Sequence, residues 1–525
     1  MPKEENEISV AGPSPDRFFD TEHLKGDLKG RSIRSGAVTM SSQAVKFFLR
    51  VGSFAVLGRL LTPGEFGLVA MVTVVTEFVL MFRDMGLSTA TIQRPEVSGA
   101  QVSTLFWVNV GIGAALAAIT ALLAPVLVWW NAEPELIKIT PVLAIGFILG
   151  GLAIQHEALL KRQMRFSALA MIELASVAVG IAMAIVSAML GAGYWSLVVM
   201  HVAMSAAMTV GVWLALGWRP GRPRLRCGVR SMLTFGRDIV AYRIVNYLGT
   251  NTDKFLLGRY WGRDVLGLYG RAYGLLMLPI TQITWPITTV ALPAMSRILD
   301  EPEKYARYYA RLVQLLAFVT MPLVVLLAVC SRSVILLVLG DQWTGASRIF
   351  QILAVTAFIQ PLSSTVVLVL LSLGLSGRLL KLGIFSGSLI VLAFIVGIRW
   401  GAVGVACGYA VASYLILFPG LWFAFRDTPV SIATALQAVW RAVIASGVTA
   451  LALILVHPYL LGLANIAIFG VCFVVAACVY LLVWISIPGG IEVLRDFAGY
   501  IALIYQKKES GESRTFILGV MAFII

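Results

Sequence analysis

Fourteen apolar segments, each long enough to cross a bilayer, follow one another along this chain of 525 residues. A transmembrane helix needs about 20 mostly apolar residues to span roughly 30 Å of hydrocarbon. Charged residues make up only 13% of the chain, against roughly 25% in soluble domains. We therefore predict an all-α membrane protein of about fourteen transmembrane helices. Their approximate limits are 38–60, 65–86, 103–130, 136–158, 167–190, 194–217, 232–258, 265–290, 308–330, 346–374, 380–399, 402–424, 437–456 and 464–486.

The third and tenth predicted helices are longer than a straight crossing requires. Each contains a proline, Pro125 in the third and Pro361 in the tenth. Proline removes one helical hydrogen bond and clashes with the preceding turn, so we expect a kink at each position.

Lysine and arginine collect in alternate connections between the predicted helices. The first 35 residues and the connections at 159–166 and 217–230 each hold several, whereas each connection on the opposite side holds two at most. Cytoplasmic loops of membrane proteins carry such an excess of positive charge. The pattern predicts that both termini face the cytoplasm, and it explains the net charge of +14 without a nucleic-acid partner.

This topology divides the chain into six regions. They are a flexible cytoplasmic tail (1–35), a first lobe of helices 1–6 (36–217), a basic cytoplasmic linker (218–230), a second lobe of helices 7–12 (231–425), a final pair of helices 13–14 (426–486) and a cytoplasmic tail (487–525). The first tail lacks the apolar core and cleavage site of a signal peptide. The last region begins with a stretch that we interpret as an amphipathic interfacial helix.

An internal repeat relates the two predicted lobes. The segment LGRLLTPGEFGL at 57–68 recurs 200 residues later as LGRYWGRDVLGL at 257–268, with L-G-R and the final G-L in register. Each copy ends one span and opens the next, so helices 1 and 2 correspond to helices 7 and 8. Coincidence in a chain rich in glycine and leucine is the alternative. Repeats in the same orientation predict two pseudosymmetric lobes around a central path, which is transporter architecture.

Basic residues lie within the predicted spans, where a charge is costly unless it meets water, a partner or a substrate. They are Lys46, Arg50, Arg243, Lys254 and Arg271. Lys46 and Arg50 are four residues apart and share one helix face. Two like charges there are explained by a wet cavity that receives an anion such as a phosphate or diphosphate. Alternatively, these side chains snorkel to headgroups, or Lys254 lies near the outer interface.

Three acidic residues also lie within the spans: Glu77, Glu173 and Asp253. Glu77 and Glu173 are counter-ions for neighbouring cations on the structural interpretation. On the functional interpretation they couple transport to an ion gradient. Asp253 is a further candidate counter-ion or ion-coupling residue, or alternatively it lies near the outer interface.

No motif of an enzyme, metal site or cofactor site is present in the sequence. It lacks a Walker P-loop and a D-x-D sugar-nucleotide motif, and His156-Glu157 lacks the second histidine of H-E-x-x-H. The five cysteines have no paired spacing. We therefore expect neither a metal nor a cofactor, and the shortness of the connections argues against an enzyme.

Several short motifs keep a characteristic order and spacing. They are GRLLTPGEFG (58–67), DMGLS (84–88), IQR (92–94), STLFWVN (103–109), LKRQMRF (160–166), GYWSLV (193–198), DKFLLG (253–258), GLY (267–269) and PAMS (293–296). Together they resemble the polysaccharide transporter family. These are Wzx-like flippases of the multidrug/oligosaccharidyl-lipid/polysaccharide (MOP) superfamily, and the chain looks most like exporters of colanic-acid or succinoglycan type units.

The resemblance implies the two-lobed fold of MATE and MurJ proteins. It implies a flippase of the bacterial inner membrane that moves an oligosaccharide on undecaprenyl diphosphate from the cytoplasmic to the periplasmic leaflet, for exopolysaccharide or lipopolysaccharide biosynthesis. Membrane lipids, Wzy-type polymerases and the export machinery would be its partners. Carried over by position, Arg50 and Arg271 would line a cationic central cavity, with Lys46, Arg243 and Lys254 as further candidates.

Three other functions fit such a chain. A multidrug or cation antiporter of the same superfamily would favour buried carboxylates over a basic excess. A membrane glycosyltransferase, polymerase or ligase would need a sizeable extramembrane loop. A lipid scramblase would need no chemical specificity. The excess of cations in the spans favours the flippase.

Overall fold

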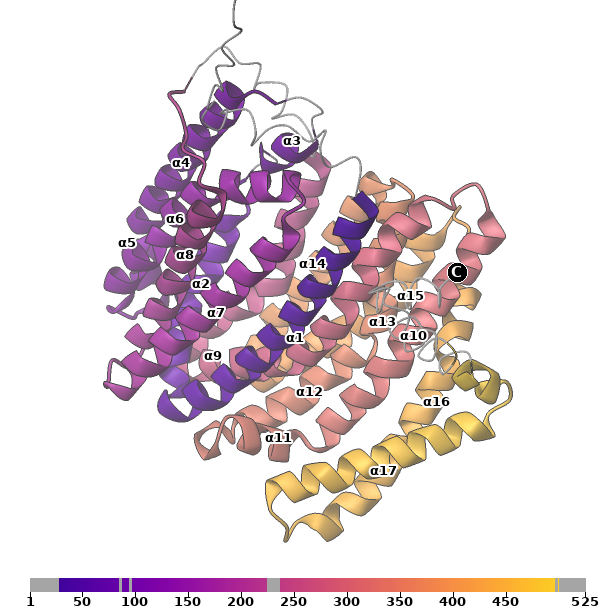
Figure 1. Cartoon of the computed structure of the whole chain (residues 1–525). Helices are drawn as coiled ribbons and strands as arrows, with labels where there is room; N and C mark the ends of the chain where they lie inside the picture. Colours follow the sequence, from indigo (N-terminus) through magenta and orange to yellow (C-terminus); the bar gives the residue numbers. More distant parts are fainter. Residues whose placement is uncertain (1–27, 85–86, 94–96, 224–236, 496–498, 500–525) are drawn as a thin grey trace, which may run out of the picture.

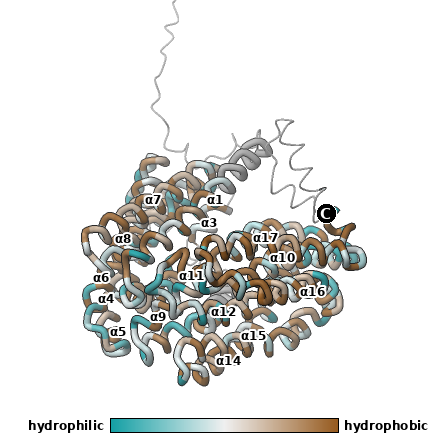
Figure 2. Tube along the Cα trace, turned by 90° about the horizontal axis from the view of Figure 1, so that it is seen from below, coloured by the Kyte–Doolittle hydropathy of each residue, from teal (hydrophilic) through white to brown (hydrophobic). Residues whose placement is uncertain are grey.

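The structure is a computed structural model that describes residues 28–84, 87–93, 97–223, 237–495 and 499. Most of the two predicted tails, about half of the predicted interfacial helix (487–505) and part of the linker lie outside these residues. The described chain is helical throughout its spans (Figure 1). Most of the tube in Figure 2 is pale or brown, which reflects the apolar sequence.

The helices follow the order of the predicted spans. The first half contains α1 (Leu28–Leu60), α2 (Pro63–Leu80), α3 (Leu87–Gln93), α4 (Gly99–Leu122), α5 (Ala124–Asn131), α6 (Leu136–Arg162), α7 (Phe166–Met189) and α8 (Trp195–Leu216). The second half contains α9 (Arg237–Ser296), α10 (Pro302–Val329), α11 (Ser331–Val338), α12 (Ala346–Phe358), α13 (Gln360–Ser372), α14 (Ser376–Gly397), α15 (Gly401–Phe425), α16 (Ile432–Val456) and α17 (Asn465–Ser486).

The lengths of these helices agree with about fourteen spans. Ten segments of the described chain are long and apolar enough to cross a membrane, or eleven if the bent pair α12 and α13 is one span. Two of them, Ile244–Ser296 with 53 residues and Ser376–Phe425 with 50, are long enough to cross twice. α9 comprises two helices that meet at Gly262, whose φ of 76° favours glycine. α1 is less apolar than the others because it carries Lys46 and Arg50.

The helix is interrupted near both prolines at which a kink was predicted. α4 ends at Leu122 and α5 begins at Ala124, with Pro125 in its first turn. α12 and α13 meet at Ile359 with a bend of 47°, and Pro361 lies in the first turn of α13. The ring of Pro361 has no N–H for the carbonyl of Ala357, so the helical ladder is interrupted there.

The helices form two lobes. In the first lobe α7 packs on α8 and α4 packs on α6, and in the second lobe α14 packs on α9 and α15. Figure 1 shows the first lobe in indigo to magenta beside the second in pink to orange, with α16 and α17 in yellow at the edge. α2 and α9 make extensive contact between the lobes. The repeat predicted these two helices as partners across the pseudo-axis.

The two copies of the repeat pack directly against each other. A Cβ atom on Gly67 would overlap the carbonyl oxygen of Arg263, and a Cβ atom on Gly267 would overlap the carbonyl oxygen of Pro63. The contact is therefore reciprocal, and each glycine admits the backbone of the other copy. We call the end of the bundle that holds 57–68 and 257–268 the hairpin end, and the end that holds the connection after α8 the linker end.

Each copy of the repeat also contacts the opposite lobe at the hairpin end. From the second lobe, Trp343 Nε1 and Gln342 Nε2 donate hydrogen bonds to the Gly58 carbonyl oxygen at 2.7 and 2.6 Å. In the other direction, Arg263 Nη1 lies 3.5 Å from Glu133 Oε2 of the first lobe. The connection after α5 and the connection after α11 occupy equivalent places in the two lobes. The hairpin end is thus joined twice by the same pseudosymmetric arrangement.

Candidate substrate site

A cavity of about 340 Å³ lies where α2, α8 and the two parts of α9 meet. Polar and apolar groups contribute about equally to its wall, and its titratable lining residues are Glu77, His201, Lys254 and Arg271. Three of these four were predicted as site residues. Two cations and one carboxylate give the wall an excess of positive charge.

Arg271 is held in place by two aromatic rings. Its Cζ lies 3.6 Å from the centroid of the Phe66 ring of α2 and 4.6 Å from that of the Phe54 ring of α1. A guanidinium on an aromatic face is attracted to the ring and keeps its N–H donors free at its edge. Within the described residues Arg271 forms no ion pair, so its donors remain available for an anion.

Lys254 and its neighbours form a polar turn of α9. Lys254 Nζ donates a hydrogen bond to Asn251 Oδ1 at 2.8 Å. Asp253 is buried, and its Oδ1 accepts a hydrogen bond from the Lys254 backbone N–H at 2.7 Å. Asp253 does not line the cavity with Lys254. The turn presents the ammonium group to the cavity and holds the carboxylate within the protein.

The cavity lies deep in the bundle. Lys254 precedes Gly262 by eight residues and Arg271 follows it by nine. At about 1.5 Å per residue, both are about 12–14 Å from the kink. This distance is close to half the thickness of a bilayer core, which is roughly 30 Å. Substrate sites of transporters built from repeats lie near this plane, at the interface between the repeats.

His201 was not among the predicted site residues. It lies on α8, where its Nδ1 is 2.8 Å from the Leu197 carbonyl oxygen. It interacts electrostatically with Arg271 and Glu77. A single histidine in an apolar helix gave no spacing signal, so only the tertiary structure could place it in the cavity. No group of three His, Cys, Asp or Glu residues among those described would hold a metal ion.

Lys46 and Glu173 are brought together away from this cavity. Lys46 Nζ of α1 lies 2.7 Å from Glu173 Oε2 of α7, and the lysine side chain is only 7% exposed. Arg50 is exposed one turn further along α1. Phe54, which packs on Arg271, follows Arg50 by another four residues and so lies near the same helix face. The side chain of Arg243 lies outside the described residues.

Comparisons with known proteins agree with this architecture. The sequence profile of a family described as polysaccharide biosynthesis proteins matches residues 56–348. The chain is 26% identical over 420 residues to the lipopolysaccharide biosynthesis protein WzxC of Escherichia coli (strain K12), covering 77% of this chain and 85% of that protein.

Two solved structures share the fold at low sequence identity. The lipid II flippase MurJ in an inward closed conformation has a TM-score of 0.68 and 13% identity, covering 86% of this chain and 98% of that one. An inward-facing MATE family multidrug resistance transporter of the MOP superfamily has a TM-score of 0.58 and 14% identity, covering 74% and 97%. The predicted MOP fold is thereby confirmed.

Proposed function

Because this chain belongs to the family of polysaccharide biosynthesis proteins, we propose that it flips an oligosaccharide carried on undecaprenyl diphosphate across the bacterial inner membrane. The chain is a multi-pass polysaccharide transporter of the MOP type and not an enzyme. The substrate, the direction of movement and the binding residues are the parts that we propose.

The observation that carries the proposal is the free guanidinium of Arg271 in a deep cavity. A diphosphate offers oxygens that the planar fork of arginine binds in pairs, and Lys254 adds a second positive charge from the opposite part of α9. Both groups line the same space. Glu77 and His201 share that wall.

We further propose that α1 guides the anion to the cavity. Lys46, Arg50 and Phe54 are spaced four residues apart, so they form a slowly turning row along one side of α1. The row begins at the Lys46–Glu173 ion pair and ends at Phe54, against Arg271. A diphosphate moving along it would pass from Lys46 to Arg50 and then, past the Phe54 ring, to Arg271.

We propose that transport occurs by alternating access, and the packing of the repeats supports this. The reciprocal glycine contact and the contacts of Gly58 and Arg263 close the hairpin end, so loading would occur from the linker end. We place the linker end in the cytoplasm because of the arginines after α8. Separation of the two copies of the repeat would then release the substrate on the periplasmic side.

A deletion of the gene tests the flippase function. Cells without the protein should accumulate the lipid-linked oligosaccharide in the cytoplasmic leaflet, where a membrane-impermeant reagent added to right-side-out vesicles does not reach its sugar. A plasmid copy should restore export. Normal export by the deletion strain, or accumulation of the oligosaccharide in the periplasmic leaflet, would contradict the proposal.

Replacing Arg50 tests the row on α1 independently of the charged cavity. We expect Arg50→Ala to reduce export strongly and Arg50→Lys to retain part of it, because lysine keeps the charge but loses the bidentate contact. Arg50 forms no ion pair among the described residues, so its removal leaves no buried partner behind. Export is measured as surface polymer, with the amount of protein in the membrane as control. Wild-type export by Arg50→Ala would remove α1 from the path.

A further inference from the structure

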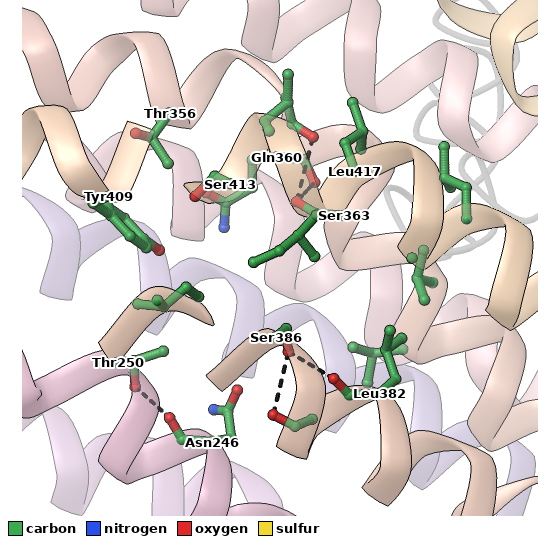
Figure 3. Close-up of a pocket in the computed structure, with 18 of the residues that line it drawn as sticks. Asn246, Thr250, Thr356, Gln360, Ser363, Leu382, Ser386, Tyr409, Ser413 and Leu417 are labelled. Carbon is green, nitrogen blue, oxygen red and sulfur yellow. Dashed lines mark hydrogen bonds between the residues drawn. The ribbon is translucent and has the colours of Figure 1, made fainter. Parts of the chain in front are cut away.

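A second cavity, of about 250 Å³, lies inside the second lobe between α9, α12, α13, α14 and α15 (Figure 3). We call it the neutral pocket, because none of its described lining residues is charged. The polar groups on which the argument rests are Asn246, Thr250, Thr356, Gln360, Tyr409 and Ser413. An anion or an organic cation has no counter-charge in such a space.

Several of these groups have no hydrogen-bond partner within the described chain. The Thr356 hydroxyl is buried and unpaired. The side-chain amides of Asn246 and Gln360 likewise form no hydrogen bond with described residues. Figure 3 shows Thr356 and Gln360 on one side of the pocket and Thr250 and Asn246 on the other, with open space between them. Asn246 is exposed and Gln360 half-buried, so their amide groups are open to a polar ligand in the pocket.

The helix break between α12 and α13 lies in the wall of the neutral pocket. The bend of 47° lies at Ile359, which lines the pocket beside Gln360. Pro361 cannot donate a hydrogen bond to the Ala357 carbonyl. Broken helices at membrane depth are tolerated where they line a cavity, and they are found at the substrate sites of transporters.

The chemistry of the lining matches a sugar ring. Amide side chains both donate and accept hydrogen bonds, as the hydroxyls of a sugar do, and threonine and serine add further groups of both kinds. The Tyr409 ring offers an apolar surface with a polar tip. A pocket slightly smaller than the roughly 300–1,000 Å³ of drug-sized ligand sites is suited to one ring.

The neutral pocket and the charged cavity share α9 as a wall. Asn246 and Thr250 line the pocket, and Lys254 lines the cavity, at successive intervals of four residues. Asn246 and Lys254 are therefore about 12 Å apart along the helix axis. A diphosphate held at Lys254 and Arg271 would leave its sugars at this distance, towards the linker end.

We propose that the neutral pocket binds a sugar ring of the transported oligosaccharide and selects substrates by that ring. This inference rests on the proposed flippase function and adds a specificity site to it. The charged cavity holds the diphosphate that all such carriers share. The neutral pocket binds the sugar portion, which differs between polysaccharides.

Two lipids distinguish the two sites. The double variant Asn246→Ala/Gln360→Ala is purified in nanodiscs, and its dissociation constants are measured for undecaprenyl diphosphate and for the lipid-linked oligosaccharide extracted from the deletion strain. We expect wild-type affinity for undecaprenyl diphosphate and about tenfold weaker binding of the oligosaccharide lipid. Gln351→Ala, at an exposed position of α12 outside the pocket, is the matched control and should bind both lipids normally.

The other outcomes are also decisive. Equal affinities of the double variant and the wild type for the oligosaccharide lipid, or an equal loss for both lipids, would overturn the sugar pocket. The melting temperature in sodium chloride is also compared with that in choline chloride. If sodium raises it in the wild type but not in the double variant, the pocket is a cation site and the sugar pocket is overturned. A wild-type protein that binds neither lipid would instead overturn the proposed function itself.

Discussion

Arg271→Ala is expected to abolish polysaccharide export while the protein reaches the membrane in normal amount. The guanidinium lies on the Phe66 ring and forms no ion pair with described residues, so its loss leaves no unpaired carboxylate. An anion at the site would lose a bidentate, charge-assisted contact. Two such hydrogen bonds are worth about 3 kcal/mol or more, which weakens binding of undecaprenyl diphosphate at least about a hundredfold.

Two variants serve as controls for this experiment. Arg271→Lys keeps the positive charge but loses the planar guanidinium that binds an anion through two N–H groups, so we expect intermediate binding and partial export. Arg332→Ala removes an exposed arginine at the start of α11 and should export normally. If purified Arg271→Ala binds undecaprenyl diphosphate as tightly as the wild type, the cavity is not the diphosphate site.

Gly67→Ala is expected to open the hairpin end and to stop transport. The new methyl group would overlap the Arg263 carbonyl oxygen, so the two copies of the repeat must separate. Overpacking of this kind costs about 1–3 kcal/mol, which favours the open arrangement by about 5- to 150-fold. The measurement is the rate at which a maleimide labels Leu61→Cys, a buried position in the first copy of the repeat that does not line the charged cavity, in a protein without the five native cysteines.

The pseudosymmetry supplies a second variant with the same expected result. Gly267→Ala would overlap the Pro63 carbonyl oxygen, so it should accelerate labelling as Gly67→Ala does. Gly111→Ala is the control, because a Cβ atom there meets nothing within 4 Å. Unchanged labelling and export in both variants would show that the glycine contact is not part of the gate.

Together the two sites describe one transport cycle. In the proposed cycle the charged cavity is loaded from the linker end while the hairpin end is closed. The charged cavity lies on the same two helices, α2 and α9, that form the glycine contact. Binding of a diphosphate between them would change the packing of these helices. The proposed anion site and the proposed gate would thus be coupled through shared elements rather than through a distant pathway.

The sequence predicted the fold in detail because the determinants of the fold are local. A span is recognised by its own length and apolarity, and Pro125 and Pro361 interrupt helices wherever they lie. The repeat at 57–68 and 257–268 was recognisable from residue identities in the sequence. It also indicated which helices face each other across the pseudo-axis, and the contact between Gly67 and Gly267 agrees with that prediction.

The sequence by itself also determined which residues carry charge inside the membrane, because an ionisable side chain in an apolar segment is conspicuous without any structure. Only the tertiary structure decided how they are grouped. Arg271 and Lys254 share a cavity with Glu77 and His201, whereas Lys46 pairs with Glu173 elsewhere. The physical reason is that grouping depends on how helices distant in sequence are rotated against one another, and on rings such as Phe54 and Phe66 that orient Arg271.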